Sequence, residues 1–136
     1  MRILMFCAAL LCAISPGLAV AQEGASSGFA GEYVMAGKGF HPSDAPYVGT
    51  CSIAADDQAY RVSCYNEGTQ HTYIGKGLGI GDTLAIYIGD ELRGDHGSIY
   101  LAQYLVVYQR QPDGSLKGTW LHTESPAAGA ETLQPK

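Results

Sequence analysis

Apolar and polar residues alternate over short stretches of this chain, and no convincing helical stripe follows the apolar run at the N-terminus. Alternation over four to eight residues is typical of half-buried β-strands. The predicted strands are Glu32 to Ala36, Val48 to Ala54, Ala59 to Tyr65, Gln70 to Leu78, Thr83 to Ile88, Ile99 to Arg110, Leu116 to His122 and Glu131 to Leu133. Short strands that begin about every ten residues predict a sandwich or a barrel.

Turn-forming residues separate these segments. Gly37 to Pro46 is a predicted long loop, Pro112-Asp113-Gly114 a tight turn, and Gly89 to Ser98 and Ser125 to Gly129 further loops. We expect one all-β domain over residues 31–136, a small antiparallel up-and-down barrel of about eight strands. Its last strand should lie beside its first, because closure leaves no unpaired edge.

A cysteine pair tests this interpretation. Pairing around a turn at Asp56 to Ala59 sets Ile53 opposite Val62 and Cys51 opposite Cys64. Directly opposed residues of an antiparallel pair have Cα atoms about 4.5–5.5 Å apart, which suits a disulfide. We therefore predict a Cys51–Cys64 disulfide, with two buried free thiols as the alternative.

The N-terminal segment has the features of a secretory signal peptide. Arg2 precedes an apolar run, and the small residues Ala19 and Ala21 mark a cleavage site before Gln22. A lipid anchor at Cys12 is the alternative, but Leu11 is bulky for that cleavage. We expect residues 1–21 to be removed, residues 22–30 to form a flexible segment, and the protein to be secreted or periplasmic without a stable membrane anchor.

The composition narrows the function. The chain has 13 acidic and 8 basic residues, one of them Arg2 in the leader, so electrostatics disfavours nucleic-acid partners and anionic membranes. Its 9 tyrosines and 18 glycines suit strands and turns better than helices. The acidic residues are scattered, which is typical of a solvated surface.

Glycines alternate at positions 75, 77, 79 and 81. A phosphate-binding loop would need a helix directly after the glycines, whereas Asp82 to Ile88 has a strand pattern. We therefore expect a strand whose side-chain-free face makes room for neighbours inside a narrow barrel.

Three stretches carry a family resemblance: Gly75 to Ile86, Val106-Val107-Tyr108 running into Asp113 to Trp120, and Gly129 to Leu133. Their order and spacing resemble a family of small secreted bacterial β-proteins, some of which are labelled "fibronectin-binding protein". The resemblance implies a β-fold over residues 31–133 and an adhesive role, although this chain has a cysteine pair where members often have tyrosine and tryptophan. Gly118-Thr119-Trp120 is also similar to the Gly-x-Trp motif of lipocalin-like and avidin-like barrels, where it commonly lies on the first strand.

Candidate chemistry is sparse. The histidines, His41, His71, His96 and His122, are scattered, so a metal site would require the fold to bring them together. Arg93-Gly94-Asp95 matches an adhesive tripeptide, and Asp90 and Asp95 lack the spacing of a calcium loop. We expect no metal, no cofactor and, since no hydrolase motif is present, no enzymatic activity.

Two kinds of function follow. The first is a monomeric, non-enzymatic binding module that acts through its surface. The alternative is a carrier of a small apolar or aromatic ligand inside the barrel, which needs a cavity of about 300 Å³ or more. The tyrosines could form cross-strand ladders or line a pocket, and the candidate ligand-binding residues are Tyr73, Tyr87, Tyr104, Tyr108 and Trp120.

Overall fold

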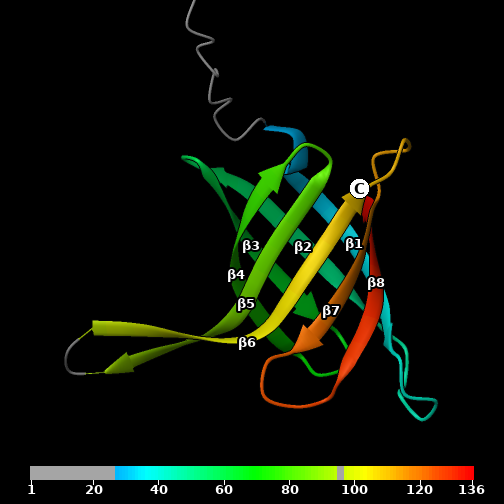
Figure 1. Cartoon of the computed structure of the whole chain (residues 1–136), viewed down its shortest axis with the longest axis vertical. Helices are drawn as coiled ribbons and strands as arrows, with labels where there is room; N and C mark the ends of the chain where they lie inside the picture. The colour runs from blue at the N-terminus through cyan, green and yellow to red at the C-terminus, as the bar shows by residue number, and fades with distance from the viewer. Residues whose placement is uncertain (1–26, 95–96) are drawn as a thin grey trace, which may run out of the picture.

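The computed structural model describes residues 27–94 and 97–136, with the side chains of 90–102 outside the description. A short 3-10 helix, η1 (Ser27–Phe29), precedes eight strands that form one closed barrel (Figure 1). The strands are β1 (Gly31–Gly39), β2 (Tyr47–Asp56), β3 (Ala59–Asn66), β4 (His71–Ile80), β5 (Thr83–Gly94), β6 (Gly97–Arg110), β7 (Leu116–His122) and β8 (Ala128–Pro135). No helix in the described ranges is long and apolar enough to cross a membrane.

The barrel has the predicted meander order. Each strand pairs antiparallel with its neighbours in the sequence, and β8 returns to pair with β1, where Met35 lies opposite Leu133. The hairpin register is also confirmed, with Ile53 opposite Val62 and Cys51 opposite Cys64. A disulfide joins Cys51 to Cys64. The alternation of side chains thus specified both the register and the pairing of the thiols.

One end of the barrel is closed by η1. Phe29 is 1% exposed, and its ring meets the edge of Tyr60 at 5.6 Å between centroids. The Arg110 guanidinium lies 4.1 Å from the centre of the Phe29 ring, and the Tyr33 hydroxyl donates a hydrogen bond to the Phe29 carbonyl. Residues 27–29, which belong to the segment expected to be flexible, therefore form a helical turn that packs on the barrel, because Phe29 has apolar surface to bury.

The glycines of β4 serve the packing of this interior. A Cβ at Gly79 would lie 2.9 Å from the Phe29 ring and 3.1 Å from the Tyr60 ring, and one at Gly77 would lie 2.9 Å from Ile86. Gly81 lies in the following turn with a φ of 58° and open space around it. The prediction that the glycine face makes room for neighbours is confirmed for Gly75, Gly77 and Gly79, and is wrong for Gly81, which the turn removes from the strand.

The expected loop at residues 89–98 is wrong. β5 and β6 stay paired from Thr83 opposite Gln109 to Gly94 opposite Gly97, with a register shift between Ile88 and Gly89. Beyond the shift the two strands leave the barrel wall as a narrow arm (Figure 1). The two strands of the arm pair their backbone groups with each other. They therefore need no buried side-chain face, and a segment rich in glycine and acidic residues can form strands there.

Candidate functional site

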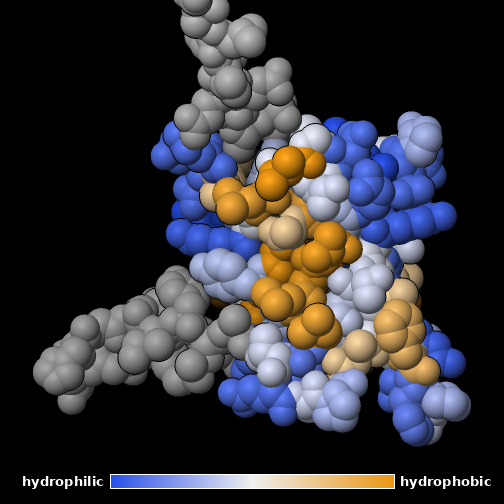
Figure 2. Space-filling model, in the orientation of Figure 1, coloured by the Kyte–Doolittle hydropathy of each residue, from blue (hydrophilic) through white to orange (hydrophobic). Residues whose placement is uncertain are grey.

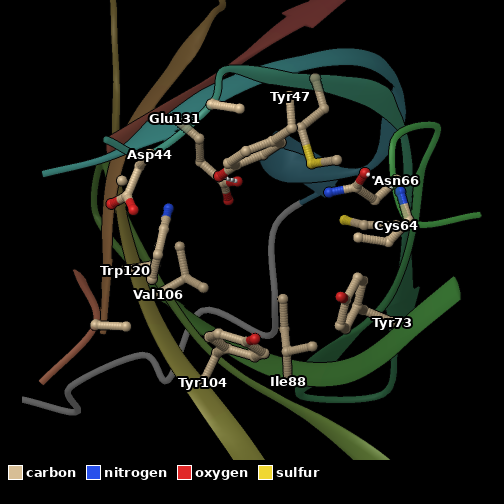
Figure 3. A pocket seen from close by; sticks show the side chains of 15 residues that line it. Asp44, Tyr47, Cys64, Asn66, Tyr73, Ile88, Tyr104, Val106, Trp120 and Glu131 are labelled. Carbon is tan, nitrogen blue, oxygen red and sulfur yellow. Dashed lines mark hydrogen bonds between the residues drawn. The ribbon is translucent and has the colours of Figure 1, made fainter. Parts of the chain in front are cut away.

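The end of the barrel opposite Phe29 is hollow. It contains a cavity of about 340 Å³ that opens among the loops joining β1 to β2, β3 to β4 and β7 to β8 (Figure 3). The lining residues are Met35, Gly39, Asp44, Ala45, Tyr47, Cys64, Asn66, Thr69, Tyr73, Ile88, Tyr104, Val106, Trp120, Ala127 and Glu131.

Side-chain size explains why this end is hollow and the other is filled. Gly39, Ala45, Thr69 and Ala127 contribute little volume around the mouth of the cavity. The closed end instead holds large buried side chains, namely Phe29, Tyr60, Leu84, Leu116 and Leu133. The small residues therefore surround the open end of the barrel, and the large ones fill the end that η1 covers.

A connected row of aromatic rings forms one wall of the cavity. Tyr73 meets Tyr104 at 5.8 Å between centroids, and Tyr104 meets Trp120 at 5.8 Å, both edge-on. Edge-to-face geometry is the favourable arrangement for such rings. The tyrosines were expected either to form ladders between strands or to line a pocket. This row does both, because its rings contact one another across β4, β6 and β7 and also line the cavity.

The other two predicted residues lie elsewhere. Tyr108 is 1% exposed and lies within the core, where its hydroxyl donates a hydrogen bond to Glu131 Oε1. Tyr87 follows the inward-facing Ile86 on β5 and lies beside Arg61 and Lys76, outside the main cavity. The structure therefore brings Tyr73, Tyr104 and Trp120 together, uses Tyr108 as support, and leaves Tyr87 apart.

Glu131 is the principal residue that the sequence interpretation missed. Its side chain lies on β8 with 9% exposure, and its carboxylate points into the cavity (Figure 3). The Tyr47 hydroxyl donates to Oε2 at 2.7 Å, while Tyr108 donates to Oε1. A sequence signal existed, because strand alternation places Glu131 on the same face as Leu133, a core residue.

Burial changes the pKa of Glu131 and of the two tyrosines that contact it. Desolvation raises the pKa of Glu131, and the hydrogen bonds from Tyr108 and Tyr47 oppose that rise. Desolvation also raises the pKa of Tyr47 and of Tyr108, and the adjacent Glu131 carboxylate raises both further. Both tyrosines are consequently neutral hydrogen-bond donors near neutral pH.

Two further polar groups lie at the cavity. The indole N–H of Trp120 is buried without a hydrogen-bond partner in the described part of the chain. It is near enough to the Tyr47 hydroxyl to lower the pKa of Tyr47, though without the geometry of a hydrogen bond. Asp44 is half-buried in the loop after β1, and its Oδ2 accepts a hydrogen bond from the His41 backbone N–H at 3.0 Å.

The histidines occupy separate places. The rings of His71 and His122 lie edge-on to Tyr73 and Tyr104, at 4.7 and 5.0 Å between centroids, and His41 contacts Ser43. Asp95 and His96 lie outside the described residues, as does the side chain of Arg93. Within the described ranges, no group of three or more possible ligands could hold a metal ion.

No protein-family model matches this chain, and no curated protein sequence was found to be similar to it. The geometry of the cavity is therefore the basis for assigning a function.

Proposed function

We propose that the protein is a non-enzymatic carrier that binds a small, mainly apolar or aromatic ligand in the open end of its barrel. The observation that supports this most strongly is the cavity of about 340 Å³ with its row of Tyr73, Tyr104 and Trp120. Ligand sites are typically concave, about 300–1,000 Å³ in volume, mostly apolar, and equipped with a few polar groups that orient the ligand.

The polar groups fit that role. The Glu131 carboxylate and the Trp120 indole N–H both lie at the cavity, which is otherwise lined largely by aromatic and aliphatic side chains. Tyr47 and Tyr108 fix the Glu131 side chain from two elements, β2 and β6. A ligand would therefore bind in a mainly apolar cavity beside a carboxyl group, Glu131, that is already held in place.

The proposal places the protein outside the cytoplasm. The Cys51–Cys64 disulfide is compatible with an oxidising extracellular or periplasmic compartment. Secretion through removal of residues 1–21, and function as a monomer, belong to the same proposal.

The only tryptophan in the sequence lines the cavity and gives a direct test. Energy transfer from Trp120 to 1-N-phenylnaphthylamine should rise saturably as the dye fills the cavity. Val106→Phe, which adds volume to a cavity-lining position, should weaken dye binding about tenfold or more. The matched control is Val107→Phe, whose site on the same strand is 53% exposed, and it should bind like the unmodified protein.

Equal binding by both variants, in proteins with comparable melting temperatures, would refute binding in the cavity. If Val106→Phe does not fold, Thr69→Phe provides a second test, because Thr69 is an exposed residue at the mouth of the cavity. The added phenyl ring should obstruct entry from the loop without overpacking the core, and it leaves Trp120 as the only tryptophan.

A second candidate is binding through the outer surface, supported by an apolar patch on β4 to β7. Figure 2 shows this apolar band on one face of the barrel. The exposed members are Leu78, Ile80, Leu105, Val107 and Leu121, between 46% and 79% exposed. Leu105 on β6 lies directly opposite Leu121 on β7, so the two side chains are neighbours on the barrel surface. Contiguous exposed apolar surface often marks an interaction site.

The resemblance to proteins labelled as fibronectin-binding supplies a probe for this candidate. Surface plasmon resonance on immobilised fibronectin should show binding that Val107→Glu abolishes and Val106→Phe preserves. Absence of binding by the unmodified protein would remove fibronectin as the surface partner.

A further inference from the structure

We infer that the ligand of this cavity is a small organic cation, an amine with an apolar or aromatic body whose ammonium group binds beside Glu131. The inference rests on the proposed function and specifies the chemical class of the ligand.

The charged side chains that line the cavity are acidic. Glu131 and Asp44 are the ionisable carboxyl groups that line the cavity, and no lysine, arginine or histidine among the described residues lines it. An anionic ligand would therefore approach two carboxylates with no opposing cation. A cationic ligand would be attracted by both.

Glu131 has hydrogen-bond donors around it but no counter-charge among the described residues. Its carboxylate is buried and accepts hydrogen bonds from Tyr47 and Tyr108, but it has no basic partner in the described part of the chain. A buried carboxylate without a counter-charge is costly, and neutral phenol donors offset only part of that cost. An ammonium group at the cavity side of Glu131 would supply the missing counter-charge.

Much of the cavity wall is aromatic. Tyr47, Tyr73, Tyr104 and Trp120 all line the same cavity as Glu131 (Figure 3). The electron-rich faces of tyrosine and tryptophan attract cations, and tryptophan is the strongest of these. An anionic site would instead need several converging donors, whereas among the described residues that line the cavity the one buried donor without a partner is the Trp120 N–H.

Calorimetric titration of the full protein at pH 7.5 with three ligands of similar shape tests the charge preference. The ligands are 2-phenylethylamine, which is cationic, 2-phenylethanol, which is neutral, and 3-phenylpropanoate, which is anionic. We expect the amine to bind about tenfold more tightly than the alcohol, and the carboxylate to bind most weakly.

Glu131→Gln keeps the shape of the side chain and removes its charge, so it should reduce the preference for the amine to about twofold or less. The control is Glu32→Gln, which removes the same charge from an exposed residue on β1 outside the cavity and should leave the preference unchanged. Asp44→Asn should weaken amine binding by a smaller factor. The comparison of the three ligands on unmodified protein holds whether or not Glu131→Gln folds.

The outcomes separate this inference from the proposed function. If the alcohol or the carboxylate binds as tightly as the amine, the ligand is not selected by positive charge and the inference is overturned while cavity binding stands. If 1-N-phenylnaphthylamine binds in the cavity but the amine does not bind, the inference alone fails. If neither the dye nor any of the three ligands binds, both fail.

Discussion

At the scale of single residues, Glu131 is the most consequential side chain in this protein. It is a carboxyl group held in an apolar interior by two phenols, Tyr47 and Tyr108. Buried carboxyl groups of this kind are uncommon unless they are paired or used. Its position places a buried carboxyl group in a cavity that is lined largely by aromatic and aliphatic side chains.

Burial of Glu131 predicts a pH dependence of stability. Because its pKa is raised in the folded state, the native protein holds this proton more tightly than the unfolded chain does. The protonated Glu131 therefore adds to the free energy of unfolding. This contribution is fully present below about pH 4.3, the pKa of a glutamate in the unfolded chain, and it is lost as the pH rises through the pKa of Glu131 in the folded protein. Glu131→Gln has no such titration.

Urea unfolding of the ligand-free protein and of Glu131→Gln, from pH 4 to pH 8, measures this effect. The free energy of unfolding of the unmodified protein, minus that of the variant, should fall as the pH rises and then level off. A difference that is flat or that increases with pH would show that the pKa of Glu131 is not raised by the fold.

Some residues could be assigned from the sequence and others could not. Cys51 and Cys64 were predicted correctly because a short hairpin places them opposite each other by local register alone. Glu131 was overlooked because a lone acidic residue is usually exposed, and only its spacing from Leu133 showed that it faces the core. Phe29 was overlooked because its partners, Tyr60 and Arg110, are distant in the sequence.

At the scale of elements, strand β4 shows how absent side chains determine packing. Its glycines face the interior, and the space above Gly79 is occupied by the rings of Phe29 and Tyr60. The sequence correctly predicted that the glycines of β4 make room for neighbouring side chains. It wrongly predicted a loop where β5 and β6 form the arm. Strands are predicted from the alternation of apolar and polar residues, which arises when one face of the strand is buried. An arm that leaves the barrel wall does not need this alternation, so its sequence does not indicate strands.

Gly79→Ala is expected to destabilise the protein by about 1–3 kcal/mol, because the new methyl group would overpack the closed end. The added Cβ would lie 2.9 Å from Phe29 and 3.1 Å from Tyr60. The neighbouring Leu78→Ala is the control, since Leu78 is 59% exposed, and it should change stability by about 0.5 kcal/mol or less. Chemical denaturation of both variants checks this, and equal losses would contradict the assigned packing.

At the scale of the whole molecule, the barrel has one closed and one hollow end. The closed meander could be predicted because eight short strands with sequential turns favour it. The hollow end could not, because it depends on small residues that meet only after closure: Gly39 at the end of β1, and Ala45, Thr69 and Ala127 in three different loops. The same closure collects Tyr73, Tyr104 and Trp120 on one wall.

The location of the bound ligand is the central claim, and methyl NMR tests it most directly. On addition of 1-N-phenylnaphthylamine to protein with labelled Ile, Leu, Val and Met methyl groups, the largest shifts should occur at Met35, Ile88 and Val106 in the cavity. The buried Leu84 at the closed end and the exposed Val107 outside should change little. Shifts concentrated on the exposed methyl groups of Leu78, Ile80, Leu105 and Val107 would contradict binding in the cavity and would locate the ligand on the outer surface.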